Sequence, residues 1–279
     1  MIDLPISHDA RELARLIQTA VQRHPTVDPW RPGADATDRN PALGGALSAI
    51  GWHDLGAEDG WLPYIAPAAR ELGRGFAPLD TIDQFLGGAL RVGAYARYSE
   101  VGDVLVSLVE GGGLRSERAL RLQPVGYTDA IGIRQVIEVH DLTVELDDDA
   151  RRRRAAWLAG TLGYLAGLTE EALRLATEHV MTREAFGRPL AALEPVQQQL
   201  ASAATLTTGI SLLTAERVEP AALSHAAEAA CQVTAICQQV TGAIGYALEF
   251  PLQRAFRRSR VLQLWTDEAL FVGLSRQPQ

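Results

Sequence analysis

TREAFGRPL, residues 182–190, interrupts a long alanine- and leucine-rich stretch whose composition is typical of helix. Two interpretations of this interruption are open. Gly187 is able to adopt the left-handed conformation that ends many helices, which would make the segment a simple helix terminus. Alternatively, Arg183 supplies a planar cationic fork suited to a phosphate group, which would make the segment part of a binding site. In both cases the segment separates two helical regions of the chain.

The sequence around this segment predicts four long helices, at about 150–182, 194–217, 220–241 and 249–272. Pro195 and Pro220 fall in first turns, where proline is tolerated. Acidic residues precede the first of these helices in DDDARRRR, residues 147–154, and suit its positive end. The four arginines that follow indicate a solvated, ion-paired face. Together these features predict a C-terminal four-helix bundle over residues 147–279.

The first half of the chain divides into two further regions. From residue 8 to about 87 apolar residues recur at helical spacing, as in Leu13, Ile17 and Val21. Residues 88–146 differ, because segments such as DVLVSLVE and IRQVIEVHDLTVEL are rich in Val and Ile and partly alternate. We expect a few antiparallel strands there, too few to stand alone. The chain is therefore predicted to be α+β and mostly α, with an N-terminal helical region (1–87), a reduced β region (88–146) and the bundle.

Composition excludes several classes of function. The net charge of −8 argues against non-specific binding to nucleic acid or to a membrane surface. All 26 basic residues are arginine, so lysine-based covalent chemistry is excluded. No apolar stretch approaches the roughly 20 residues that span a bilayer, and the N-terminus lacks the pattern of a secretory signal. Cys231 and Cys237 are interpreted as buried thiols, and the expected location is cytoplasmic.

Motifs of several common enzyme classes are missing from the sequence. It contains no HExxH, CxxC, P-loop or GxSxG segment. No two histidines stand at metal-ligand spacing; the six are at positions 8, 24, 53, 140, 179 and 225. We therefore predict no metal site.

A second informative segment is QQVTGAIGYALEFPLQRAFRRSR, residues 238–260. Gln239, Gly242 and Gly245 are expected to end one helix in a glycine-containing turn, and Glu249 to open the next helix. Such a turn allows backbone amides to approach a phosphate closely. Two segments suited to phosphate therefore border the helices of the same bundle.

These two segments resemble the C-terminal bundle of the acyl-CoA dehydrogenase family. Its Arg-x-x-Phe-Gly motif is matched by Arg183, Phe186 and Gly187. Its Gln-x-x-Gly-Gly-x-Gly-[FY]-x-x-Glu-[FY]-Pro motif is matched by Gln239, Gly242, Gly245, Tyr246, Glu249, Phe250 and Pro251. Arg257 and Arg260 fit the Arg-Asp-Ala-[KR] box that follows, and ELGRGFAPLD, residues 71–80, is similar to an N-terminal element of the family.

The resemblance implies N-terminal helices, a middle β-domain, a C-terminal four-helix bundle and FAD bound between subunits. In the family, the first motif and the glutamine and first glycines of the second contact the FAD of a neighbouring protomer. By resemblance, Arg183, Phe186, Gln239 and Gly242 are the expected cofactor-binding residues.

The resemblance fails at the catalytic base. The family removes the α-proton of an acyl-CoA thioester with a glutamate that lies 27 residues after the motif glutamine, a position held here by Thr266. A threonine cannot serve as that base. Asp267 and Glu268 are adjacent candidates that would have to approach from a different angle. A minority of the family places the glutamate 26 residues before the motif arginine, and Trp157 occupies that position.

The resemblance also fails in the middle region. The family holds its flavin ring with a Thr-Glu-Pro…Gly-Ser-Asp loop and a tryptophan-containing strand, and neither occurs between residues 75 and 146. That region is about half the expected length. The second glycine of the turn is replaced by Ala243. The chain thus keeps the segments that reach a neighbour's FAD and lacks much of the cradle for its own.

Three hypotheses follow. The first is a non-catalytic or half-site subunit of a FAD-dependent complex that α,β-dehydrogenates an acyl-CoA thioester, with the partner supplying the base. The second is a scaffold repurposed without flavin for a non-redox step such as cyclisation or dehydration, using Asp267, Glu268, Tyr246 or Tyr164. The third is a self-contained FAD dehydrogenase with a relocated base. The expected partner is another acyl-CoA dehydrogenase subunit or a second copy of the chain.

Overall fold

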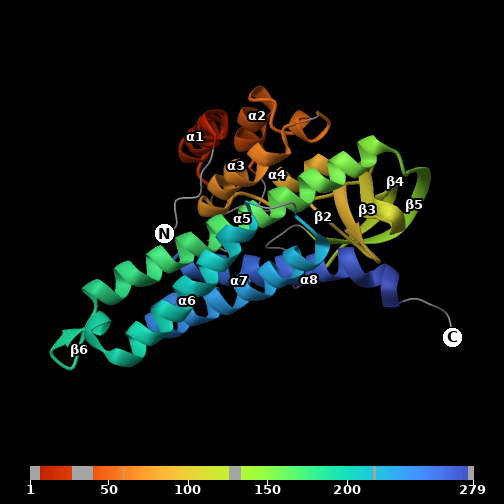
Figure 1. Ribbon diagram of the computed structural model, residues 1–279. Helices are drawn as coiled ribbons and strands as arrows, with labels where there is room; N and C mark the ends of the chain where they lie inside the picture. Colours follow the sequence, from red (N-terminus) through yellow and green to blue (C-terminus); the bar gives the residue numbers. More distant parts are fainter. Residues whose placement is uncertain (1–6, 27–39, 59, 126–132, 216–217, 276–279) are drawn as a thin grey trace.

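The computed structural model describes residues 7–26, 40–58, 60–125, 133–215 and 218–275, with side chains described up to residue 270. Three regions are visible in Figure 1: short N-terminal helices, a small barrel, and a bundle of long helices. The helices are α1 (His8–Arg23), α2 (Pro41–Ala49), α3 (Leu62–Arg74), α4 (Asp80–Asp83), α5 (Asp148–Thr182), α6 (Glu194–Leu213), α7 (Pro220–Thr241) and α8 (Leu252–Ser275). The strands are β1 (Ala89–Val92), β2 (Tyr95–Arg97), β3 (Val104–Leu108), β4 (Leu114–Pro124), β5 (Ile133–Glu145), β6 (Glu184–Ala185) and β7 (Arg188–Pro189).

The predicted fold class, α+β and mostly α with a C-terminal four-helix bundle, is confirmed. Helix α5 is the axis of the molecule, since α3, α6, α7 and α8 all pack against it. It begins where the acidic run predicted, because the side chain of Asp147 accepts a hydrogen bond from the Ala150 N–H at 2.9 Å. Over its central part α5 is buried on all sides, which explains why its sequence is rich in alanine, glycine and leucine. Cys231 and Cys237 are buried free thiols of α7.

Helices α3 and α5 approach each other unusually closely through glycines. A Cβ atom on Gly163 would overlap the backbone carbonyl of Ala66, and one on Gly167 would overlap that of Arg70. With no side chain between them, the two backbones are in direct contact. This contact fixes the N-terminal helices on the bundle.

Gly167→Ala is therefore expected to lower the free energy of unfolding by about 3 kcal/mol, because an added methyl must push two packed helices apart. The matched control is Gly209→Ala in α6, where no heavy atom lies within 4 Å of an added Cβ. That change should stabilise the chain by about 0.5–1 kcal/mol through helix propensity. Urea unfolding of both variants measures the difference. Equal effects of the two substitutions would contradict direct backbone contact at Gly167.

The β region forms a closed barrel with the order β1-β2-β5-β4-β3. The expectation of purely antiparallel strands was wrong at one pair, because β1 and β3 run parallel, with Ala89 opposite Leu105. After the β1–β2 hairpin the chain crosses over, and β3 lies on the other side of β1 from β2. This parallel pair closes the sheet and leaves no free edge. In the described part of the barrel, a small cluster of buried Ala96, Leu105 and Ala119 forms its own core, with partly buried residues around it, and the barrel also packs against α8 and α5.

No helix in the described part of the chain combines the length and the hydropathy needed to cross a membrane.

Candidate functional site

TREAFGRPL forms a hairpin that projects from the end of α5. The helix stops at Thr182, and β6 and β7 pair on either side of Phe186 and Gly187. Both residues have positive φ angles, 55° and 74°, which is the geometry of a two-residue type I′ turn. Gly187 is therefore not the helix stop that one interpretation of the sequence allowed, because it lies at the hairpin tip, five residues after the end of α5. Arg183 is exposed at the base of the hairpin.

Phe186 stands out at this tip, since 92% of its side chain is exposed and its backbone is left-handed. An aromatic residue in that conformation is strained by about 1–2 kcal/mol and gains no burial in the isolated chain. Strain of this kind is typical of residues that serve a binding site.

Phe186→Asn is expected to raise the free energy of unfolding by up to about 1 kcal/mol, because Asn-Gly is a favoured pair for this turn. Gly187→Ala should have the opposite effect and cost about 1 kcal/mol, because alanine resists a φ of 74°. Urea unfolding of the isolated chain measures both changes. A loss of stability in Phe186→Asn would mean that the ring is packed against this chain after all.

The glycine-containing segment forms a tight turn between α7 and α8. Gly242 has φ 67° and ψ −146°, a conformation open essentially to glycine alone. The buried Gln238 donates from Nε2 to the Gly245 carbonyl at 3.1 Å and holds the turn in place. Its neighbour Gln239 is exposed and faces solvent with Gly242. The expectation that Glu249 opens the next helix was wrong, because the turn continues to Pro251 and α8 begins at Leu252.

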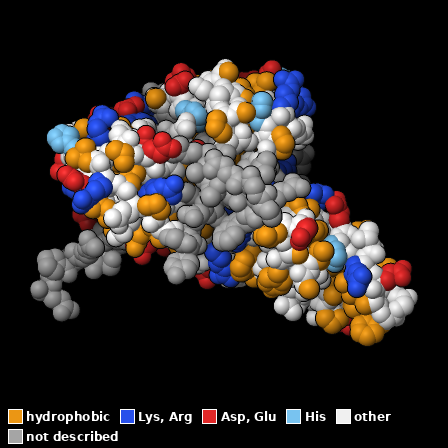
Figure 2. Space-filling model, turned by 180° about the vertical axis from the view of Figure 1, so that it is seen from behind, with side chains coloured by type: hydrophobic (Ala, Val, Ile, Leu, Met, Phe, Trp, Pro, Cys, Tyr) orange, Lys and Arg blue, Asp and Glu red, His pale blue; other side chains and the backbone are white. Residues whose placement is uncertain are grey.

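The two segments lie together at one end of the bundle. The ring of His179, in the last turn of α5, contacts the ring of Phe250 edge-on at 5.8 Å. Hydrophobic side chains gather at this end of the molecule, as Figure 2 shows. The exposed ones that belong to the two segments and their borders are Met181, Phe186, Ile244, Tyr246 and Leu248. We call this surface the hairpin end; beside these apolar side chains it carries Arg183, Gln239 and Gly242.

The positions that hold the catalytic glutamate in the family lie at the opposite end of the bundle, near the barrel, and they converge. Trp157 is buried and donates from Nε1 to Asp83 Oδ1 at 3.1 Å. Asp83 also accepts two hydrogen bonds of 2.6 Å from the guanidinium of Arg97. Arg97 in turn lies 5.3 Å from the ring centroid of Trp265, the residue before Thr266. Trp157, which holds one base position, and Trp265, which precedes the other in the sequence, thus border one buried ion pair.

The adjacent carboxylates do not reach this place. Helix α8 continues without a break through residues 264–270, so Thr266 is 1% exposed in mid-helix instead of lying in a turn. Asp267 accepts a hydrogen bond of 2.6 Å from the Ser224 hydroxyl on α7. Glu268 is exposed. An uninterrupted helix rotates each successive residue by about 100°, which directs these two carboxylates away from the Thr266 side.

The hairpin end is too far from this buried place to serve it within one chain. Residues 157 and 183 are separated by the length of α5, about 39 Å at the ordinary helical rise of 1.5 Å per residue. Arg183 and Phe186 therefore lie too far from Trp157 to contact a ligand held beside it.

A flavin fits one of these two places. The buried place lacks room for a ring, since Asp83, Arg97 and Trp157 are each no more than about 1% exposed and pack against one another. The hairpin end offers an exposed guanidinium, an exposed aromatic ring and a glycine turn open to backbone contact, which are groups of the kind that bind a dinucleotide.

Sequence reasoning did not identify four residues that build these two places: Asp83, Arg97, Trp265 and Gln238. The segment around Arg97, RVGAYARYSE (residues 91–100), shows no pattern that marks this arginine as a buried charge. No spacing rule connects Asp83 with Arg97, because their contact exists only in the folded barrel.

This architecture, with a long-helix bundle, a barrel on one end and helices packed on α5, defines the class of protein. Residues 154–266 match the family model "Acyl-CoA dehydrogenase, C-terminal domain". Cyclohex-1-ene-1-carbonyl-CoA dehydrogenase of Syntrophus aciditrophicus is 30% identical over 113 residues, which are 36% of this chain and 27% of that protein. 3-Sulfinopropanoyl-CoA desulfinase of Paraburkholderia xenovorans is 28% identical over 171 residues, 56% of this chain and 39% of that protein. The chain thus covers well under half of these curated relatives.

Solved structures share the fold over the whole chain. The ChsE4-ChsE5 complex from Mycobacterium tuberculosis has a chain that matches with a TM-score of 0.66 and 16% identity, covering 100% of both chains. Butyryl-CoA dehydrogenase from Megasphaera elsdenii matches with a TM-score of 0.62 and 13% identity, covering 99% of this chain and 100% of that one. Residues 154–266 thus match the acyl-CoA dehydrogenase family, and the whole chain shares the fold of solved acyl-CoA dehydrogenases.

Proposed function

We propose that this chain is the half-site subunit of a FAD-dependent acyl-CoA dehydrogenase complex. Its hairpin end contacts the flavin of a partner chain. In place of a reaction centre of its own, the chain has a packed structural core. The observation that carries this proposal is the contrast between the two ends of α5. One end keeps the exposed residues of both flavin motifs, and the other end has replaced both base positions with buried tryptophan and threonine.

At the partner's flavin, each residue has a distinct task. The Arg183 guanidinium would hold the pyrophosphate, and the ring of Phe186 would lie against the cofactor. Gln239 donates from its exposed amide, and Gly242 allows the backbone to come close because it has no side chain. The bound flavin supplies the hydride acceptor for the β-carbon of the thioester. The proton is removed by the partner, since neither Asp267 nor Glu268 faces the buried centre.

The partner is another acyl-CoA dehydrogenase chain with an intact flavin cradle and a catalytic glutamate. The apolar hairpin end supports contact with such a chain, because a cluster of large exposed hydrophobic side chains marks an interaction surface. The structural neighbour from Mycobacterium tuberculosis is described as a complex of two different chains.

The repurposed non-redox enzyme receives no support from the geometry. Tyr164 is buried and donates to the Ala77 carbonyl at 2.7 Å. Tyr246 lies in the turn after α7, whereas Asp267 is held by Ser224 near the other end of that helix. The helical rise separates these two by about 26 Å. The four candidate residues therefore do not form one site.

The test is the visible absorption spectrum of the chain purified alone, mixed with FAD and desalted, and then of the chain purified with a co-expressed full-length partner. We expect no flavin band from the chain alone and a retained band from the complex. A retained band in the chain alone would favour the self-contained dehydrogenase and overturn the half-site proposal. A stable, colourless chain that captures no flavoprotein partner in its native cell would overturn it too.

A further inference from the structure

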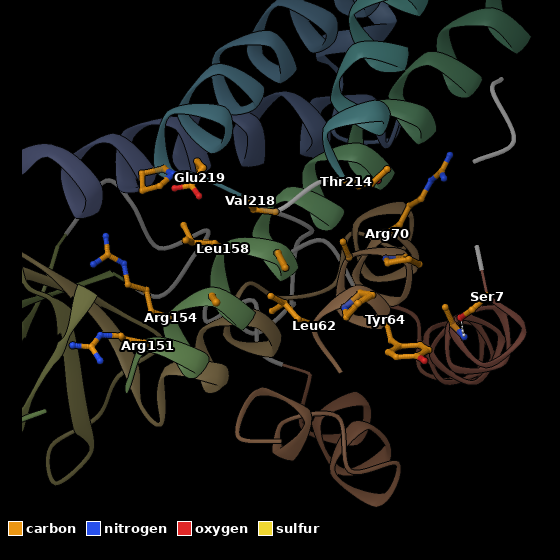
Figure 3. A pocket seen from close by; sticks show the side chains of 18 of the residues that line it. Ser7, Leu62, Tyr64, Arg70, Arg151, Arg154, Leu158, Thr214, Val218 and Glu219 are labelled. Atoms are coloured by element: carbon orange, nitrogen blue, oxygen red, sulfur yellow. Dashed lines mark hydrogen bonds between the residues drawn. The ribbon is translucent and has the colours of Figure 1, made fainter. Parts of the chain in front are cut away.

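A large cavity lies on a side of α5 that the proposed function does not use. Its volume is about 1000 Å³, and it opens between α3, the first half of α5 and the α6–α7 connection. Figure 3 shows Arg151 and Arg154 at one end, Leu62, Leu158 and Val218 along the middle, and Tyr64 and Arg70 towards the other end. None of the residues of the filled centre, Asp83, Arg97, Trp157 and Trp265, lines it.

Arg154 differs from the three arginines that precede it. Arg151 pairs with Asp148 at 2.7 Å, Arg152 with Asp149 at 3.6 Å, and Arg153 with Asp149 at 2.9 Å. These three confirm the expected ion-paired face. Arg154 does not belong to it: its guanidinium is half-buried, and no carboxylate in the described part of the chain lies within 4.0 Å.

The guanidinium of Arg154 has most of its hydrogen-bonding capacity left. Its Nη1 donates to the Val109 carbonyl at 3.3 Å, a single weak bond from a group with five N–H donors. Burial lowers the pKa of Arg154, which shows that the site disfavours its charge. A cation placed there without a counterion is costly, and an anion in the cavity would relieve that cost.

The other charged groups of the cavity do not supply that anion. Arg70, at the far end, is already neutralised by the buried carboxylate of Glu170. Glu219 also lines the cavity, but its side chain is exposed to solvent. Between the two ends Leu62, Leu158 and Val218 form an apolar strip, with Thr214 and Glu219 beside it. The cavity therefore combines one cation that lacks a carboxylate partner among the described residues with a largely apolar wall.

We propose that this cavity binds an amphiphile with a single carboxylate, whose head group takes the free N–H groups of Arg154 and whose apolar body lies along Leu158, Leu62 and Val218. The planar guanidinium accepts a carboxylate in a two-bond fork, and the apolar walls select for a hydrocarbon tail. The proposal does not depend on the half-site function, because the hairpin end and the filled centre take no part in it.

The test is isothermal titration calorimetry of the purified full chain with octanoate, and with octanol as the uncharged probe of the same length. We expect octanoate to bind at least about tenfold more tightly than octanol, as a charge-assisted pair requires. Arg154→Gln should weaken octanoate binding at least about tenfold, and the matched control Arg152→Gln should leave it within about twofold. Thermal unfolding checks that both variants are folded.

Two results would overturn the proposal. One is absence of octanoate binding to the wild-type chain, or equal binding of octanoate and octanol. The other is unchanged octanoate binding by a folded Arg154→Gln variant. The comparison of the two probes on the wild-type chain decides the question even if the variant does not fold.

Discussion

Arg183→Ala is expected to release the flavin from the complex of this chain with its partner while both chains remain assembled. A bidentate charge-assisted contact with a phosphate contributes about 1.5–3 kcal/mol, so its loss should weaken FAD binding by about 10- to 100-fold. The side chain is exposed, so the variant chain should unfold at the same urea concentration as the wild type. The measurement is the flavin retained per complex after desalting, followed by a titration with FAD.

Arg188→Ala is the control for this prediction. Arg188 is equally exposed, lies on the other strand of the same hairpin and is absent from the flavin motif. Its substitution should leave flavin retention unchanged, which separates a specific contact from a general loss of positive charge. If Arg183→Ala and Arg188→Ala retained flavin equally well, the hairpin end would not contact the cofactor, and the exposed Phe186 would need another explanation.

The sequence was most informative where structure depends on local pattern. The acidic run before residue 148, the prolines at 195 and 220 and the apolar spacing of Leu13 and Ile17 each act over one or two helical turns, so the helices they predicted are present. Strand content followed from Val- and Ile-rich alternation for the same reason. The two flavin segments were found because each is contiguous in the chain and matches a known motif.

Features that depend on contacts between distant segments could not be predicted in this way. The closure of the barrel needs a parallel pair between β1 and β3, and nothing in the composition of either strand specifies that partner. The buried ion pair of Asp83 with Arg97 and the contact of Arg97 with Trp265 likewise join segments far apart in the sequence. The sequence showed that glutamate was missing from both base positions, but only the fold shows that the vacated place is filled.

That filled place gives the largest expected effect on stability. Asp83→Ala is expected to lower the free energy of unfolding by about 3–5 kcal/mol, because it leaves the Arg97 guanidinium buried without a counterion. It also removes the acceptor of the Trp157 indole. Asp148→Ala is the control. Asp148 and Arg151 form an ion pair in which their side chains are 84% and 54% exposed, so losing this pair should lower the free energy of unfolding by less than about 1 kcal/mol. Urea unfolding of the isolated chain measures both.

A double replacement distinguishes a structural core from a remnant of a reaction centre. If Asp83 and Arg97 only hold the barrel on the bundle, replacing both by apolar residues of similar size, as in Asp83→Leu with Arg97→Met, should recover most of the stability lost in Asp83→Ala. In contrast, groups retained for chemistry would be needed for activity of the complex and not for folding. We expect the doubly substituted chain to fold, to assemble with the partner and to support dehydrogenation at the wild-type rate. A complex that assembles but loses activity would show that this chain's own centre takes part in the reaction.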